Sequence, residues 1–189
     1  SHLSRSPGDK SPYHHLTVLA KDYVGYRNLL QLTTKAHLEG FYYKPRIDKA
    51  LLEQHRDGLI VLSGCPSAEI PRLLRENRDH DAREAAQWYL DTFEHFFFEL
   101  QWHENMPFLQ ELNAKLIAIA GELNVPMVLT NDCHYVHQAD APTQDVLVCI
   151  HTNTNLQDDK RLKMSDDSFY LRSPQEMEAL FPDLPEVTE

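Results

Sequence analysis

The sequence predicts an α/β fold in which parallel strands alternate with helices. Short apolar runs recur along the chain, and stretches with apolar residues at three- and four-residue spacing separate them. One run, residues 58–64 (GLIVLSG), is continuous and bounded by glycines, which is typical of a strand covered on both faces. Such alternation indicates right-handed βαβ units, in either an open sheet or a closed barrel.

The pattern gives the expected elements in order. Residues 1–11 are polar and are expected to form a disordered or loop tail, because they lack the apolar core of a secretory signal. Strands are expected at 15–20, 58–64, 96–101, 126–130 and 168–172. Helices are expected at 22–40, 48–52, 67–77, 79–94, 106–123 and 139–151. Asp48 should cap a short helix, and Ser173 with Glu176 should form a capping box.

Composition excludes several classes of protein. A chain of 189 residues corresponds to about one domain, and it contains no apolar run near the roughly 20 residues that a membrane-spanning helix needs. The net charge of −11 argues against a broad nucleic-acid-binding face. Three cysteines, Cys65, Cys133 and Cys149, form no C-x-x-C pair, which fits a reducing cytoplasm.

Potential metal-ligand side chains follow three of the predicted strands. Both architectures place their chemistry beyond the carboxyl ends of the strands, where Cys65, residues 101–103 with His103, and Asp132 with His134 lie. Residues two apart on an extended chain project to one face, so Asp132 and His134 can bind one cation while Cys133 points away. Alternatively, Asp132 and His134 only cap the end of the strand or form a salt bridge, and Cys65 is a small buried apolar residue.

Several long strings carry a family resemblance. YHHLTVLAKDYVGYRNLLQL, LEGFYYKPRID, GLIVLSGCPSAEIPRLL, VLTNDCHYV and DDSFYLRSPQEMEALF together resemble the polymerase and histidinol phosphatase (PHP) domain of bacterial DNA polymerase III alpha subunits. The resemblance implies a distorted seven-stranded (βα)7 barrel. Residues 12–189 would be its C-terminal two-thirds, ending close to the junction with the following polymerase region.

The resemblance also implies a cluster of divalent metal ions, either zinc, manganese or iron. His15, Cys65, Asp132 and His134 match ligand positions of the family. The opening H-x-H motif, a further histidine and a strand-end glutamate of the family would lie upstream of Ser1, so we expect sub-stoichiometric metal and no independent catalysis. His15 precedes its strand, so its assignment depends on the resemblance alone.

Other polar residues near the predicted strand ends receive lesser roles. Arg46 in KPRID is a candidate for binding a substrate phosphate, with a structural salt bridge as the alternative. The family pattern makes neither Glu99 nor His103 a ligand, and Glu99 is expected to line the barrel or support the metal site. His14 is expected at the surface or in packing.

The implied function is metal-dependent phosphoester hydrolysis, which in some relatives is a 3′ to 5′ exonuclease. A metal-free scaffold for polymerase and exonuclease subunits is the alternative. A stand-alone histidinol-phosphatase-like hydrolase is disfavoured by the FYYKPRID and SFYLRSPQEMEALF strings. Nucleotide addition, with magnesium, would belong to residues beyond Glu189. In the parent protein the implied partners are DNA, an exonuclease subunit and a sliding clamp, with no membrane and little direct nucleic-acid binding by this acidic chain.

Overall fold

The computed structural model describes residues 13–184 and residue 187, so the expected tail at 1–11 lies outside the described residues. In the described part, four strands form one sheet in the order β1 (Thr17–Ala20), β2 (Leu59–Leu62), β3 (His95–Gln101) and β4 (Met127–Thr130). The helices are α1 (Tyr23–Leu38), α2 (Lys49–Gln54), α3 (Glu69–Arg75), α4 (Asp79–Thr92), α5 (Phe108–Leu123), the 3-10 turn η1 (Gln138–Asp140), α6 (Ala141–Thr152) and α7 (Pro174–Glu178). The α/β class is confirmed.

The chain divides into two compact units. The N-terminal unit comprises Ser1–Phe98 and Ile119–Pro126, and the C-terminal unit comprises Glu99–Ala118 and Met127–Glu189. The boundary therefore passes through both β3 and α5. Two of the predicted metal ligands fall in each unit.

The first strand runs against the predicted direction. β2 and β3 are parallel, but β1 pairs antiparallel with β2, so that Thr17 lies opposite Leu62 and Ala20 opposite Leu59. The Lys21 backbone N–H donates to the Gly58 carbonyl oxygen over 2.8 Å. The connection through α1 and α2 therefore leaves β1 and enters β2 at the same end of these two strands. Alternation of strands and helices does not fix this direction, and the prediction of an all-parallel sheet was wrong for β1.

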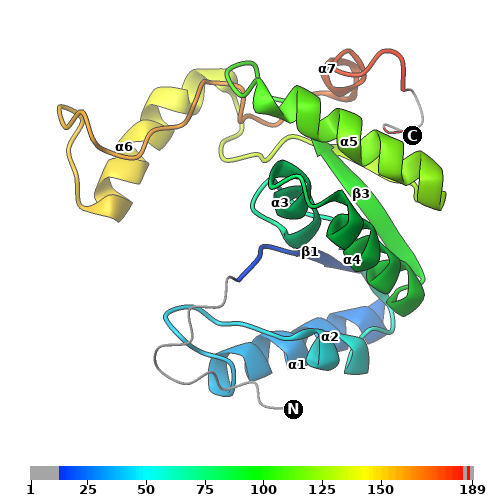
Figure 1. Cartoon of the computed structure of the whole chain (residues 1–189). Helices are drawn as coiled ribbons and strands as arrows, with labels where there is room; N and C mark the ends of the chain where they lie inside the picture. The colour runs from blue at the N-terminus through cyan, green and yellow to red at the C-terminus, as the bar shows by residue number, and fades with distance from the viewer. Residues whose placement is uncertain (1–12, 185–186, 188–189) are drawn as a thin grey trace. The chain divides into compact units, whose positions relative to one another are not determined.

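The core of the N-terminal unit consists of apolar side chains from its strands and helices. Asp22 caps α1 by accepting from the Gly25 N–H over 2.9 Å, and Asp48 caps α2 as expected, with 2.8 Å to the Leu51 N–H. The fully buried side chains include Leu59, Val61, Ile70, Leu74, Ala82, Ala86 and Phe98. The helices α3 and α4 pack together in this unit (Figure 1).

Helix α5, expected at residues 106–123, buries one apolar face. Leu112, Leu116 and Ile119 are buried, but Phe108 at the first position is 38% exposed and Leu109 is buried in its place. The seven-stranded barrel remains a prediction beyond this four-stranded, mostly parallel sheet. Among the described residues, we find no helix both long enough and apolar enough to span a bilayer.

The predicted strand at 168–172 is wrong. This segment makes one isolated β-bridge, between Tyr135 and Tyr170, and is part of none of the strands β1 to β4. Phe169 is nevertheless buried, which explains the apolar pattern. The capping box is confirmed, since the Ser173 hydroxyl accepts from the Glu176 N–H and the Glu176 carboxylate accepts from the Ser173 N–H at the start of α7.

Candidate metal centre

His15 and Cys65 lie together in the N-terminal unit. The Cys65 Sγ is 3.4 Å from the His15 Nδ1, and His15 forms a parallel bridge with Ala68. Because β1 is antiparallel to β2, the residues before β1 lie at the carboxyl end of β2. The position of His15 ahead of its strand, which the sequence left unexplained, is therefore a strand-end position of β2.

A tight turn holds Cys65. Gly64 has a φ of +85°, and a Cβ there would lie 2.7 Å from the Ala68 Cβ. A side chain at this position would therefore be strained and would also push the loop away. The Ala68 N–H donates to the Cys65 carbonyl over 2.8 Å, which closes the turn.

Asp132 and His134 lie together in the C-terminal unit, although not for the reason that the sequence suggested. Asp132 has a φ of +46°, so the chain is not extended there and simple strand alternation does not apply. An Oδ1 of Asp132 is nevertheless 3.9 Å from the His134 Nδ1. That nitrogen is also 2.7 Å from the Asp132 carbonyl oxygen, so it carries the proton and leaves the Nε2 lone pair available.

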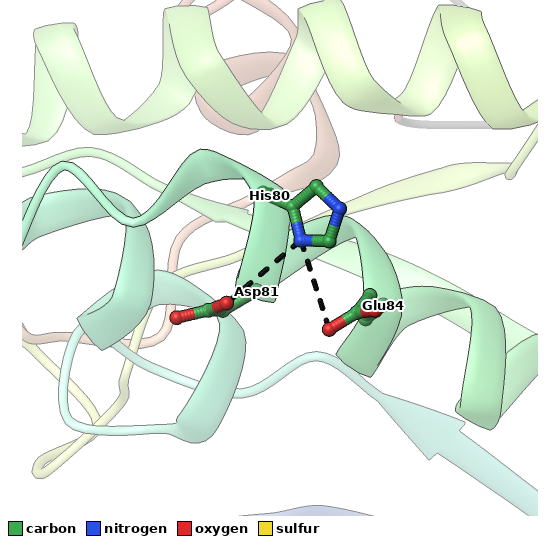
Figure 2. Close-up of side chains that lie close together, drawn as sticks. All are labelled: His80, Asp81 and Glu84. Atoms are coloured by element: carbon green, nitrogen blue, oxygen red, sulfur yellow. Dashed lines mark ion pairs between the residues drawn. The ribbon is translucent and has the colours of Figure 1, made fainter.

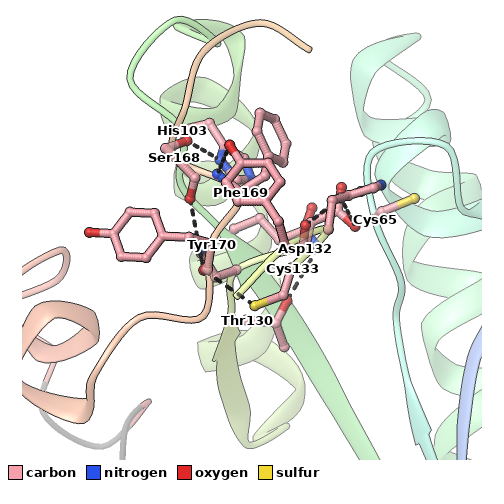
Figure 3. A network of polar contacts seen from close by, with 12 residues as sticks. Cys65, His103, Thr130, Asp132, Cys133, Ser168, Phe169 and Tyr170 are labelled. Carbon is pink, nitrogen blue, oxygen red and sulfur yellow. Dashed lines mark hydrogen bonds and ion pairs between the residues drawn. The ribbon is translucent and has the colours of Figure 1, made fainter. Parts of the chain in front are cut away.

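The segment mispredicted as a strand supports this loop. Asn131 donates to the Ser168 and Tyr170 carbonyls over 2.8 and 2.7 Å, and the His134 N–H donates to the Phe169 carbonyl over 2.8 Å. The Cys133 thiol donates to the Tyr170 carbonyl oxygen over 3.4 Å (Figure 3). The backbone of the Asp132–His134 pair is thus fixed on both sides.

Glu99 is buried within the C-terminal unit, and its role in lining a barrel or supporting a metal site stays a prediction. Its carboxylate accepts from the Thr130 hydroxyl over 2.6 Å and from the Gln101 side chain over 3.1 Å. It joins β3 to the end of β4, directly before the loop that carries Asp132.

His103, which follows a predicted strand but matches no ligand position of the family, is buried. It is 3% exposed, and its ring stacks on Phe169 with centroids 4.0 Å apart. Its Nδ1 is 2.7 Å from the Ser168 hydroxyl oxygen (Figure 3). Burial lowers its pKa, although the nearby Asp166 and Asp132 oppose that shift. Burial therefore favours the neutral form of the ring.

Arg46 borders a pocket of the N-terminal unit. The pocket has a volume of about 510 Å³, and His14, His15, Lys44 and Lys49 are among its lining residues. Among the described residues, the guanidinium contacts the Gly40 carbonyl, 3.3 Å from Nε, and the Tyr42 ring, 4.9 Å from its centroid. Its role toward a phosphate stays a prediction.

A third group of potential ligands lies on the surface of α4 and was not predicted. His80 Nδ1 is 3.9 Å from Asp81 Oδ1 and 3.7 Å from Glu84 Oε2 (Figure 2). Within the described residues, these three side chains bring donor atoms within 4.8 Å of one another. Asp81 is engaged by Arg78 over 2.6 Å, and the His80 side chain is 83% exposed. The arrangement is that of surface ion pairs.

Comparison with known proteins defines the class to which this fold and these residues belong. The PHP domain family matches residues 3–103, a range that includes the His15–Cys65 pair, β1, β2 and β3. The chain belongs to the PHP domain family.

Individual proteins similar to this chain point to a narrower group within the family. The chain is 46% identical over 177 residues to the DNA polymerase III subunit alpha of Treponema pallidum and to that of Borreliella burgdorferi, with 93% of this chain covered in each case. It is 41% identical over 180 residues to the DNA polymerase III subunit alpha of Deinococcus radiodurans, with 95% covered. The chain spans 15%, 15% and 13% of the length of these relatives, respectively.

Proposed function

We propose that this chain is part of a bacterial DNA polymerase III alpha subunit and carries part of a metal-dependent phosphoesterase site of the 3′ to 5′ exonuclease type. The observation that carries the proposal is the His15–Cys65 pair, whose donor atoms lie 3.4 Å apart at the carboxyl end of β2. The similarity to the relatives continues past residue 103 and covers 93% of the chain, including Asp132 and His134.

The donor atoms fit divalent transition metals. An imidazole with a thiolate suits zinc or iron, and an imidazole with a carboxylate suits zinc, manganese or iron. In the second pair, the Asp132 carbonyl holds the His134 Nδ1, 2.7 Å away, which orients the ring and exposes Nε2 as the ligand atom. Each unit therefore supplies two side chains whose chemistry suits a metal ligand.

The bound ions would lower the pKa of a coordinated water and stabilise charge on the leaving oxygen of a phosphodiester. Arg46 would bind a phosphate oxygen at the pocket that His15 also lines. Glu99, bonded to Thr130 over 2.6 Å, would hold the end of β4 in place. For the longer protein, the same proposal includes DNA-directed DNA polymerase activity with magnesium. It also includes contacts with an exonuclease subunit and a sliding clamp, and a cytoplasmic location.

Elemental analysis of the purified chain for zinc, manganese and iron tests the metal site. We expect Asp132→Ala combined with His134→Ala to remove metal that the wild type retains, and His15→Ala combined with Cys65→Ala to do the same for its own pair. The matched control is His80→Ala with Glu84→Ala, which removes two exposed donors from α4 and should leave the metal content unchanged. Absence of metal from the wild type after reconstitution would refute the phosphoesterase proposal and favour a scaffold.

A further inference from the structure

Helix α6 of the C-terminal unit is apolar on two sides, one of which is exposed. Cys149 on the inner side is buried. On the outer side, Val146, Leu147 and Ile150 are 41%, 53% and 71% exposed, and Thr143 is exposed beside them. These four residues have the spacing i, i+3, i+4 and i+7, so they form one stripe along the helix. A helix that is apolar all round is ordinarily covered on all sides. The described residues leave this stripe uncovered.

The exposed stripe carries no charge. Asp145 is the only Asp, Glu, Lys or Arg residue within α6, although 25% of the whole chain is charged. Both oxygens of its carboxylate accept from the Arg161 guanidinium, with 2.6 Å between Oδ2 and Arg161 Nη2. The Arg161 side chain is buried in this pair. The charge of α6 is therefore neutralised internally, and charged side chains of the helix do not separate the stripe from an apolar partner.

The same contacts fix the shape of α6 before any partner binds. The segment that follows the helix runs back alongside it and supplies Arg161 (Figure 1). Asn153, with a φ of +52°, ends the helix, and the Thr154 N–H donates to the Cys149 carbonyl over 2.9 Å. Among the described helices and strands, the main contact of α6 is with η1, which directly precedes it. A preformed helix with an open face loses little conformational entropy when it binds.

The size of the stripe favours a partner on the same polypeptide. Three aliphatic side chains and a threonine present much less than the roughly 800 Å² per partner that a stable complex of separate proteins buries. A covalently linked partner needs less area, because linkage gives an effective concentration in the millimolar range. This chain spans 15% of the length of its Treponema pallidum and Borreliella burgdorferi relatives. Most of the subunit proposed above therefore lies outside this chain.

We propose that the stripe of α6 docks into an apolar groove formed by the part of the alpha subunit that lies outside this chain. Apolar anchors at i, i+3, i+4 and i+7 are those of a helix that binds in a groove. The groove would be uncharged where it meets the stripe, since a charge buried there would find no opposite charge on α6. The inference rests on the proposed function, in which this chain is part of an alpha subunit, and adds an internal docking surface to it.

The first test compares wild-type proteins. Hydrogen–deuterium exchange of the α6 amides is measured in this chain alone and in the full alpha subunit that contains it. We expect exchange to be slower in the subunit by about 10-fold or more, because covering the stripe raises the free energy needed to open the helix. Equal exchange rates in the two proteins would overturn the proposal.

The second test uses substitutions in the full subunit. Leu147→Gln combined with Ile150→Gln keeps good helix formers in α6 but removes the anchors, and it should return the α6 exchange rates to those of the isolated chain. Leu38→Gln combined with Leu171→Gln is the matched control, since it removes two exposed leucines outside α6 and should leave α6 protected. Protection of α6 that survives the first pair of substitutions would refute docking through the stripe.

Two further measurements separate this proposal from its alternatives. Sedimentation velocity of the isolated chain should show a monomer, and a dimer that Leu147→Gln with Ile150→Gln dissociates would assign the stripe to a second copy instead. Metal analysis of the same samples distinguishes the two proposals. Unprotected α6 in a subunit that retains its metal would overturn the docking surface alone, whereas a metal-free subunit with protected α6 would overturn the phosphoesterase site alone.

Discussion

At the scale of single residues, Glu176 illustrates how local hydrogen bonds determine a charge. Its carboxylate accepts from the Ser173 N–H and hydroxyl, each over 2.8 Å, and from the Tyr170 hydroxyl over 2.7 Å. These bonds favour the ionised form and lower the pKa of Glu176 to about 2, with the Tyr170 bond as the largest cause. The capping box therefore also ties α7 to the segment that supports the Asp132–His134 loop.

This gives a prediction about pH. The folded pKa of Glu176 lies below its ordinary value of 4.5, so its stabilising effect is complete above pH 4.5 and is lost as the pH falls toward about 2. We expect Glu176→Gln to melt below the wild type at neutral pH, and the difference to narrow below pH 4.5. Thermal melts from pH 7 to pH 3 measure this. Glu178→Gln, on the same helix but outside the capping box, is the control, and a difference that does not change with pH would contradict the charge argument.

At the scale of elements, the first turn of α1 lies directly against the turn that precedes β2. A Cβ on Gly25 would lie 1.8 Å from the Gly58 carbonyl oxygen, and Gly58 itself has a φ of +70°. The Gly58 carbonyl of the same turn accepts the Lys21 N–H at the end of the antiparallel β1–β2 pairing. Gly25 therefore allows α1 to pack closely on the turn that leads into β2.

A pair of glycine substitutions tests this packing. Gly25→Ala should destabilise the fold by about 1–3 kcal/mol, because the backbone must shift to admit the methyl group. Gly121→Ala is the matched control in α5, where nothing lies within 4 Å of an added Cβ, and it should stabilise the helix by roughly 0.5–1 kcal/mol. Urea denaturation measures both changes, and equal stability of the two variants would contradict the close approach.

At the scale of the whole molecule, the order of helices and strands follows from the sequence because apolar periodicity is local. The direction of β1 could not be predicted in this way, since it depends on where a connection of two helices returns to the sheet. Residues 168–172 have a strand-like pattern because Phe169 is buried, yet they pair only at Tyr170. His103 was placed correctly at a strand end, but its hydrogen-bond partner Ser168 is 65 residues away in the chain.

The charge of the whole chain gives a further prediction. The chain has 18 Lys and Arg residues against 29 Asp and Glu residues. It can therefore make few contacts with nucleic-acid phosphates, and binding would release few counterions. We expect the metal-free chain to bind a single-stranded oligonucleotide with a Kd weaker than about 10⁻⁴ M at physiological salt. Fluorescence anisotropy measures this affinity. A micromolar Kd that weakens steeply with added salt would reveal a basic face and contradict the prediction.

The way the unit boundary crosses β3 and α5 limits how this protein can be dissected by expression. The N-terminal unit ends its first segment at Phe98 but regains Ile119–Pro126 later in the chain. That returning segment supplies the buried Val125, an ion pair of 2.7 Å between Glu122 and Arg83, and the Pro126 carbonyl that accepts the Phe98 N–H over 2.9 Å. A truncation at residue 98 would delete these contacts. A continuous segment that contains the whole N-terminal unit must run to residue 126 and so also carries residues 99–118 of the other unit.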